Sequence, residues 1–504
     1  MLKSIKTVNL ISLIFTILTF ITTSVKAGAN FNCPSTANTT SDTEYNVLLK
    51  TKSPEEALEQ FKIIASCFGI SDKLEELLSD IDTVDKCIES ASVNIPSEPP
   101  SVPVGPPNIP VGHPNIPSKP SETPKIPLKS PATPKKRLDI PKANIIPNKS
   151  FRDLSLDSDY FAFSGFYSEE VVKALSEWDA VSRVDKAVEM KAFDLNDSNS
   201  SKTSNKNSSK PQRGITQENP VWNLDRCDQE HRPLDNKYTY PSCAGGDVDV
   251  YIVDTGIDIA HPEFEGRAKY GKSVCNYCLP CPMDDNGHGT HVAGIVASKT
   301  YGVAKNASLI AVKVINSAGS GSDSDVIKGL QYVCRRAAKT GRKSVVNMSL
   351  GGGVSQALNE AVEALTAKGI NVVVAAGNDG GNACNVSPAS APSAIAVGSV
   401  KNTSDDSVSS FSDTGPCVPI YAPGEGILST FVAGLVNHIT ATLSGTSMAS
   451  PHVAGAVALY LCTFGRKSSS EMRALLTSTC DKNVIGNLPS NNSTNCLLRT
   501  PIIT

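Results

Sequence analysis

Strand-like and helix-like segments alternate in the second half of this chain, and this alternation limits the available folds more than any other feature. Four short apolar runs predict strands, and two longer segments predict helices between them. The strands are Asp247–Val253, Ser308–Ile315, Ser344–Met348 and Asn371–Ala375, and the helices are residues 323–339 and 355–368. This order predicts an α/β fold of three layers, with a mostly parallel central sheet between two layers of helices. Ligands bind such sheets beyond the carboxyl ends of the strands, so residues that follow these runs are candidates for function.

The first residues predict export from the cell. Two lysines, an apolar run and the pair Val25 and Ala27 form the pattern of a secretory signal peptide over residues 1–27. An uncleaved anchor is the alternative, but the apolar run is short for a membrane span. The later apolar run Val453–Phe464 is also short and contains a glycine. We therefore expect a secreted chain without a stable membrane anchor, and the net charge of −3 gives no argument for a nucleic-acid partner.

Fourteen cysteines fit the oxidising compartment that a secreted chain reaches, so we expect disulfides. Three lie before residue 96 and eleven after Gly214, which gives each part an odd number. Either one cysteine stays unpaired in each part or one disulfide joins the parts. The run Cys275, Cys278 and Cys281 leaves a metal site as the alternative, although no fourth ligand follows at a suitable spacing.

The segment between the signal peptide and Gly214 predicts a small α+β unit that is split in two. Its first part, residues 28–95, contains a strand at 44–50, a helix from Pro54 and an amphipathic helix at 71–90. Its second part, residues 151–195, contains a strand at 160–167, a helix at 168–178 and a strand at Val181–Met190. Both parts together are large enough for one small sheet covered by helices.

Residues 96–150 separate these two parts and have a different composition. Between Pro96 and Pro147 lie 16 of the chain's 33 prolines, and the word PNIP occurs twice. Such a segment cannot build a hydrogen-bonded core, so we expect an extended or disordered spacer. A segment that binds a polyproline-recognising partner or an acidic surface is the alternative. Residues 196–213 form a second linker, rich in Ser and Asn, of the kind that proteases cut.

Four polar residues occupy the positions where the fold predicts function. Asp254 follows a buried strand, His288 stands between two glycines at a helix start, and Asn378 closes the run NVVVAAGN. Ser447 precedes an apolar helix, whose N-terminus favours developing negative charge. Taken singly, each has a structural alternative as a turn residue, a loop histidine or a helix cap. Their joint occurrence in the order Asp, His, Asn, Ser favours a nucleophilic active site.

The sequence motifs around these residues resemble the signature motifs of subtilisin-like serine proteases, in particular the proteinase K branch. The motifs are VDTG at 253–256, GHGTHVAG at 287–294, SLGGG at 349–353, AAGN at 375–378 and SGTSMASPHVAG at 444–455. The resemblance implies that Ser447 is the nucleophile, His288 the general base and Asp254 the residue that orients the imidazole. It also implies that Asn378 and the Ser447 N–H form the oxyanion hole. His291 and His452 are expected to be packing residues.

The same resemblance implies how a peptide substrate binds. Two segments would hold it as an added strand, and a third would form a wall of the first specificity pocket. The residues are Gly319, Ser320 and Gly321, then Ser349, Leu350 and Gly351, and finally Ala375, Ala376 and Gly377. Small residues in that wall leave room for apolar or aromatic side chains, so a broad endopeptidase is expected. Asp323 and Asp325 leave a preference for basic residues open.

The early α+β unit resembles the inhibitory propeptide of the family, most clearly in FSGFYSEEVVKAL at 163–175. It would chaperone the catalytic domain, residues 214–504, and block its cleft as an intramolecular inhibitor. Cleavage is expected between Leu195 and Gly214, which leaves a mature, monomeric enzyme that starts near Ile215. The chemistry requires no cofactor. The family often binds calcium at a segment like Pro392–Ala394, but proline stands at 419 where a carboxylate ligand is usual.

Two competing hypotheses remain from the sequence alone. One is an inactive homologue that serves in binding, which the intact Asp, His, Asn and Ser disfavour. The other is a wall or coat component that acts through its proline-rich segment. Sequons at Asn306, Asn402 and Asn347 permit glycosylation, although Asn347 falls in an expected buried strand.

Overall fold

The computed structural model describes residues 43–51, 56–57, 59–61, 152–156, 160–193, 195–196, 214–275, 278, 281–433 and 437–501. The signal peptide, the helix expected at 71–90, residues 96–150 and most of the linker at 196–213 lie outside these ranges.

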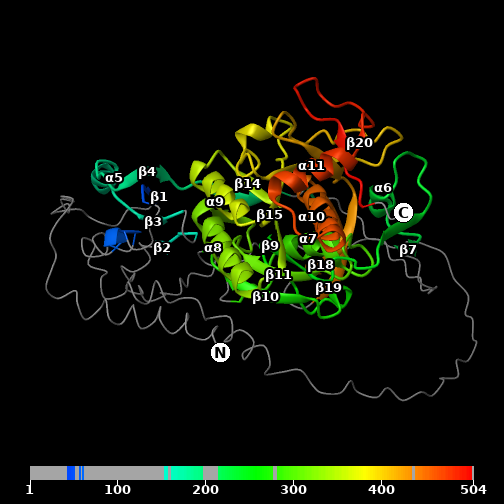
Figure 1. Cartoon of the computed structure of the whole chain (residues 1–504), viewed down its shortest axis with the longest axis horizontal. Coiled ribbons are helices and arrows are strands. Elements are labelled where there is room, and N and C mark those ends of the chain that lie inside the picture. The colour runs from blue at the N-terminus through cyan, green and yellow to red at the C-terminus, as the bar shows by residue number, and fades with distance from the viewer. Residues whose placement is uncertain are drawn as a thin grey trace, which may run out of the picture. The chain divides into compact units, whose positions relative to one another are not determined.

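A nine-stranded sheet forms the centre of the region after Gly214 (Figure 1). In spatial order it consists of β10 (Ala268–Ser273), β11 (Ser308–Lys313), β9 (Val248–Asp254), β13 (Lys343–Met348), β15 (Asn371–Ala375), β16 (Ile395–Val400), β17 (Ile420–Pro423), β21 (Cys496–Leu497) and β20 (Asp481–Lys482). Neighbouring strands are parallel throughout, except that β20 is antiparallel to β21. The expected strands correspond to β9, β11, β13 and β15, and the predicted mostly parallel α/β sheet is confirmed.

Helices cover both faces of this sheet because successive strand residues point to opposite sides. In β9, Val250 and Ile252 belong to one apolar core, while Tyr251 and Val253 belong to another. The first core is shared with α7 (His288–Ala297), α10 (Thr446–Phe464) and α11 (Ser469–Thr479). The second core is shared with α8 (Asp323–Thr340) and α9 (Gln356–Ala367), which match the two expected helices.

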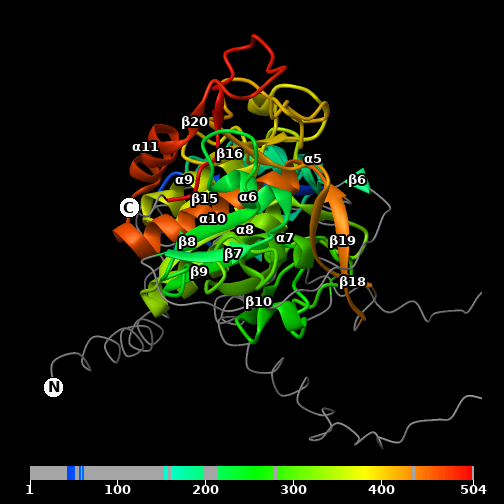
Figure 2. The same cartoon turned by 90° about the vertical axis from the view of Figure 1, so that its right-hand side faces the viewer.

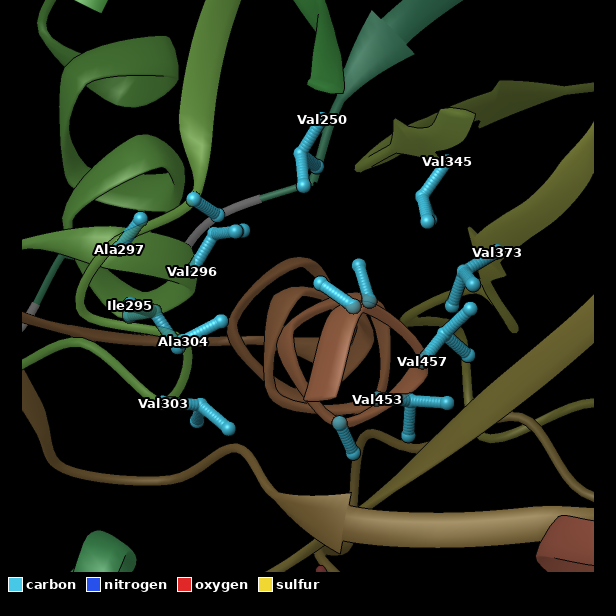
Figure 3. Packing of buried hydrophobic residues seen from close by; sticks show 14 of the residues in the cluster. Val250, Ile295, Val296, Ala297, Val303, Ala304, Val345, Val373, Val453 and Val457 are labelled. Carbon is cyan, nitrogen blue, oxygen red and sulfur yellow. The ribbon is translucent and has the colours of Figure 1, made fainter. Parts of the chain in front are cut away.

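Helix α10 lies at the centre of the first core. Figure 3 shows it surrounded by Val250, Val345 and Val373 from three strands and by Ile295 from α7. The helix begins seven residues before the expected run, and among the described helices it alone is long and apolar enough to cross a membrane. Its residues from Thr446 to Leu461 are all buried, so it is a core helix that carries Ser447 in its first turn.

The remaining short elements lie around these layers. They are α6 (Trp222–Cys227), the 3-10 helices at Pro262–Phe264 and Ala383–Asn385, and the antiparallel pair β7 (Gly214–Glu218) and β8 (Lys237–Pro241). Among the described cysteines, disulfides join Cys243–Cys462, Cys275–Cys278, Cys384–Cys417 and Cys480–Cys496, in agreement with the expectation. The described residues contain no group of three or more His, Cys, Asp or Glu that could hold a metal ion.

The early α+β unit forms a four-stranded sheet with its own core. It consists of β2 (Arg152–Asp153), β3 (Ala162–Phe166), β1 (Glu44–Leu49) and β4 (Val181–Lys186), with α5 (Glu169–Ser176) and helical residues at 56–57 and 59–61. The strand expected at Val181–Met190 is wrong as a single element. It divides into β4 and β5 (Glu189–Ala192), and β5 leaves this sheet to pair with the region after Gly214. No Gly, Pro or Asn separates β4 from β5, so the sequence did not reveal the change of partner.

Candidate active site

A buried acid and imidazole meet at the carboxyl end of the central sheet. Asp254 is the last residue of β9, His288 is the first residue of α7, and both are fully buried. Their Oδ1 and Nδ1 atoms are 2.7 Å apart. Because an ionised carboxylate only accepts hydrogen bonds, Nδ1 carries the proton and Nε2 is left as the acceptor of the neutral ring. The pair therefore has the tautomer that a general base needs.

A second buried carboxylate, Asp284, was not predicted from the sequence and holds the loops on either side of this pair. Its oxygens accept hydrogen bonds from Thr255 Oγ1 (2.9 Å), Asn286 N (3.1 Å), Gly287 N (2.8 Å), Thr290 N (2.8 Å) and Thr290 Oγ1 (2.6 Å). Thr255 follows Asp254, and the other donors lie around the start of α7, so one side chain positions both elements. Helix α7 has Gly287 at its N-cap and no side-chain cap there. An acid four residues before His288 was the available signal, since carboxylates favour helix N-termini.

The Ser447 hydroxyl lies in the first turn of α10. Its Oγ donates to Ser349 O (3.0 Å), and Ser349 Oγ donates to Ser447 O (2.8 Å). This reciprocal pair fixes the start of α10 against β14 (Leu350–Gly352). Ser349 follows β13, the strand beside β9, so Ser447 lies at the same carboxyl end of the sheet as Asp254 and His288. The four expected residues thus belong to one edge of the fold.

The side-chain amide of Asn378 is oriented by Thr446. Its Oδ1 accepts hydrogen bonds from Thr446 N (2.9 Å) and Thr446 Oγ1 (2.7 Å), which turns Nδ2 the other way. Nδ2 is buried and has no acceptor among the described residues. It lies 2.9 Å from the point where a Cβ on Gly445 would be, so it faces the residue two before Ser447. A fixed donor with its hydrogens unused suits an oxyanion.

Strand β5 of the early unit occupies the cleft between the two expected substrate-binding segments. It pairs antiparallel with β12 (Ser320–Ser322) on one side and with β14 on the other. Lys191 stands opposite both Ser320 and Gly351, and Met190 stands opposite Gly321 and Gly352. Ala192 N donates to Gly319 O at 3.1 Å. The predicted edge segments therefore bind an extended chain, which here is the protein's own.

Phe193 continues β5 toward Ser447. A Cβ on Gly351 would lie 2.7 Å from the Phe193 ring, and one on Gly445 would lie 2.6 Å from the Phe193 carbonyl oxygen. This oxygen and Asn378 Nδ2 thus approach the same point beside Gly445. Beyond it, β6 (Leu195–Asn196) pairs with β19 (Asn437–Ser444), which forms a hairpin with β18 (Ile427–Ala433; Figure 2). Strands of the early unit are therefore paired with the region after Gly214 on both sides of Phe193, through β5 before it and β6 after it.

The expected pocket wall is fully buried. Ala375 and Ala376 have no exposed surface, and Gly377 adopts a φ of 119°. A Cβ on Gly377 would lie 2.3 Å from Asp413 Oδ2, so only glycine fits there. The carboxylates of Asp323 and Asp325 are buried and hydrogen-bonded within the chain, so the preference for basic residues gains no support from them.

Two further histidines are structural, as expected. His291 Nε2 lies 3.1 Å from Ile427 O and 3.0 Å from Ala441 O, which ties α7 to the β18–β19 hairpin. His452 Nδ1 lies 2.7 Å from Met448 O. Burial lowers the pKa of His291 to about 3 and that of His452 to about 4, so both rings are neutral at physiological pH.

The segment Pro392–Ala394 does not fit calcium. Its three carbonyl oxygens accept hydrogen bonds from side chains of α11: Arg473 Nη1 to Pro392 O (2.8 Å) and Ala394 O (3.4 Å), and Ser469 Oγ to Ser393 O (2.6 Å). The Arg473 guanidinium thus occupies the place of a cation beside these carbonyls.

Comparison with known proteins agrees with this geometry. Residues 245–494 match the model of the subtilase family. Cerevisin from Saccharomyces cerevisiae is 42% identical over 324 residues, which cover 61% of this chain and 46% of cerevisin. The cuticle-degrading protease of Metarhizium anisopliae is 39% identical over 342 residues, which cover 67% of this chain and 80% of that protease.

A solved structure, described as a cold adapted subtilisin-like serine proteinase, matches with a TM-score of 0.52 and 42% identity. The match covers 56% of this chain and 100% of that one. The chain spans less than two thirds of the length of several curated relatives, cerevisin among them.

Proposed function

The chain belongs to the subtilase family, and from that premise we propose that it is a serine endopeptidase made as an autoinhibited zymogen. One observation carries the proposal: a strand of the chain itself runs between β12 and β14, and its Phe193 carbonyl oxygen and Asn378 Nδ2 would lie 2.6 and 2.9 Å from a Cβ on Gly445. An extended peptide in that register is what an endopeptidase binds.

In the proposed reaction, Ser447 Oγ attacks the carbonyl carbon of the scissile bond while its proton passes to His288 Nε2. Asp254 keeps the imidazole in the required tautomer and stabilises the imidazolium. Asn378 Nδ2 and the Ser447 N–H donate to the oxyanion. The C–N bond then breaks as His288 returns the proton to the leaving amine. Water hydrolyses the resulting acyl-enzyme by the same steps in reverse order, which restores Ser447.

The register favours self-cleavage at the bond that follows Phe193. Lys191 is opposite Gly351, Phe193 lies beside Gly351 and Gly445, and pairing resumes at Leu195 with Ser444. This bond lies two residues before the stretch in which the sequence predicts cleavage, between Leu195 and Gly214. A later cut within that linker would produce the mature start near Ile215, where described structure resumes with β7.

Substrate preference follows from the residue that occupies the site. Phe193 supports the expectation of apolar or aromatic residues before the cut, and small residues line the expected pocket wall. Met190 is the fourth residue before the proposed scissile bond. It is fully buried in the core shared with Leu350 and Val326. A broad preference for apolar residues at these two positions is therefore part of the proposal.

Secretion is also proposed, on the signal peptide expected at residues 1–27 and on the disulfides, and we propose that the secreted enzyme is a monomer. Asn306 and Asn402 are exposed and suit glycosylation. Asn347 does not, because it is buried in β13 and its amide bonds Ser349 Oγ and Ser450 Oγ.

The test uses the full chain and its Ser447→Ala variant. Wild type should react with a fluorophosphonate probe and release a fragment that ends at Phe193, as read by mass spectrometry. The variant should do neither in isolation. A variant that still matures alone, or a wild type that never labels, contradicts the proposal.

A further inference from the structure

The contact between β5 and the cleft continues past β12 to the first residue of α8. Asp323 N donates to Val188 O at 2.9 Å, and Asp323 Oδ1 accepts the Val188 N–H at 3.1 Å. Both main-chain polar groups of Val188 are therefore bound by a single residue. This extends the antiparallel ladder that pairs β5 with Ser320–Ser322 by one more bonded position.

The register fixes where this position lies in a substrate. Phe193 is the residue before the proposed scissile bond, and counting back along β5 makes Val188 the sixth residue before that bond. Its side chain is partly buried against the core that β9 shares with α8 and α9, and its Cγ1 is 3.7 Å from the position of a Cβ on Gly353. The contact with Asp323 is made to the main chain of Val188 and suits any non-proline residue.

The Asp323 carboxylate is held in place before a peptide arrives. Oδ2 accepts the Ser355 hydroxyl at 2.7 Å and Oδ1 accepts Ser324 N at 2.8 Å, and both donors belong to the region after Gly214. Ser355 is the N-cap of α9, so a structural role in joining the starts of α8 and α9 explains two of these bonds. This structural role does not explain the hydrogen bond that Asp323 Oδ1 accepts from Val188 N, which is a bond to the bound strand. Burial raises the pKa of Asp323 to about 6, so the acceptor is ionised at pH 8.

We infer that Asp323 binds the main chain of the sixth residue before the scissile bond, so that the enzyme favours long extended polypeptides over short peptides. The inference rests on the proposed function and extends its binding site beyond the segments named from the sequence. Hydrogen bonds to charged groups are the stronger class, and one that is lost costs about tenfold in binding.

The experiment compares three coumarin-amide substrates with the mature enzyme at pH 8. They are acetyl-Lys-Ala-Phe, acetyl-Val-Glu-Met-Lys-Ala-Phe, and the same hexapeptide with N-methylvaline, in which a methyl group replaces the N–H that donates to Asp323. The N-methyl group should lower kcat/KM of the hexapeptide about tenfold. Asp323→Ala should abolish the difference between the two hexapeptides, and Asp323→Asn, which keeps a neutral acceptor, should reduce it.

The outcomes separate the two proposals. If the enzyme cleaves the tripeptide and both hexapeptides, and N-methylation has no effect, the role of Asp323 is overturned while the endopeptidase stands. If no substrate is cleaved by a chain that folds, both are overturned. The decisive quantity is the ratio of kcat/KM between the hexapeptide and its N-methylated form on the same enzyme. A folding defect in a variant lowers both values and leaves this ratio unchanged.

Discussion

Gly351→Ala tests whether the Phe193 ring marks the first specificity pocket. A Cβ at residue 351 would lie 2.7 Å from Cε2 and 2.8 Å from Cζ of that ring. Carbon atoms pack at about 3.5–4.0 Å, so the ring would have to withdraw by about 1 Å. A misplacement of this size near the reacting bond can cost about 10²-fold in rate. We therefore expect kcat/KM for a substrate with Phe before the cut to fall about 10²-fold.

A substrate with Ala before the cut has no ring to displace, so its kcat/KM should fall far less. Gly353→Ala is the matched control, because its Cβ would meet only Val188 Cγ1 at 3.7 Å, an ordinary contact. Neither glycine has a positive φ, so alanine suits both backbones. The Cβ at 351 would also lie 3.1 Å from Ser387 O, so the melting temperature of each variant is measured alongside.

The assay measures kcat/KM of wild type and both variants on matched peptides with Phe, Leu or Ala before the cut. Gly351→Ala should shift preference from Phe toward Ala, and Gly353→Ala should leave the order unchanged. If Gly351→Ala cleaves Phe and Ala substrates in the wild-type ratio, the ring does not lie in the pocket and the inferred scissile bond is wrong.

Three further predictions follow from single contacts. Asn378→Ala should lower kcat about 10²- to 10³-fold with little change in KM, because Asn378 Nδ2 donates to the oxyanion. A variant whose KM rises while its kcat stays unchanged would refute this role. Asp323→Asn should stabilise the Ser447→Ala zymogen at pH 7. The pKa of Asp323, about 6 when folded, exceeds its unfolded value of about 3.9, so its ionised form destabilises the fold above pH 6 and this cost vanishes as pH falls toward 4. The gain is at most about 3 kcal/mol, and urea unfolding from pH 4 to 8 measures it; a gain that grows toward pH 4 would contradict the sign. Arg473→Gln should lower the melting temperature, because Arg473 donates hydrogen bonds to Pro392 O and Ala394 O. Since this guanidinium already occupies the place of a cation, a chelator should not change the melting temperature of wild type through Pro392–Ala394. A chelator effect that disappears in Arg473→Gln would contradict this.

The sequence predicts most of the sheet because β9, β11, β13 and β15 are buried, apart from the first residues of β11 and β13, and are rich in Val and Ile. The sequence also predicts Asp254, His288, Asn378 and Ser447 as candidate active-site residues, because each lies in a distinctive sequence motif. Asp284 was missed because its role depends on five donors from two loops that only the fold brings together. The division of Val181–Met190 was missed because partner choice in a strand depends on tertiary contacts and not on its alternation.

The structure also explains how one strand can serve as both substrate and inhibitor in the proposed zymogen. Every contact of β5 with β12, β14 and Asp323 lies before the proposed scissile bond, so cleavage after Phe193 breaks none of them. The early unit adds contacts that a free peptide lacks, since Arg183 binds Glu360 through two hydrogen bonds (2.8 and 3.2 Å) and Tyr160 donates to Ala357 O (3.1 Å). Glu360 and Ala357 belong to α9 and not to β12 or β14. A cleaved early unit therefore keeps its affinity for the catalytic domain, whereas a cleaved substrate of three to six residues does not. Removing Arg183 should speed release of the early unit without changing hydrolysis of a short peptide by the mature enzyme.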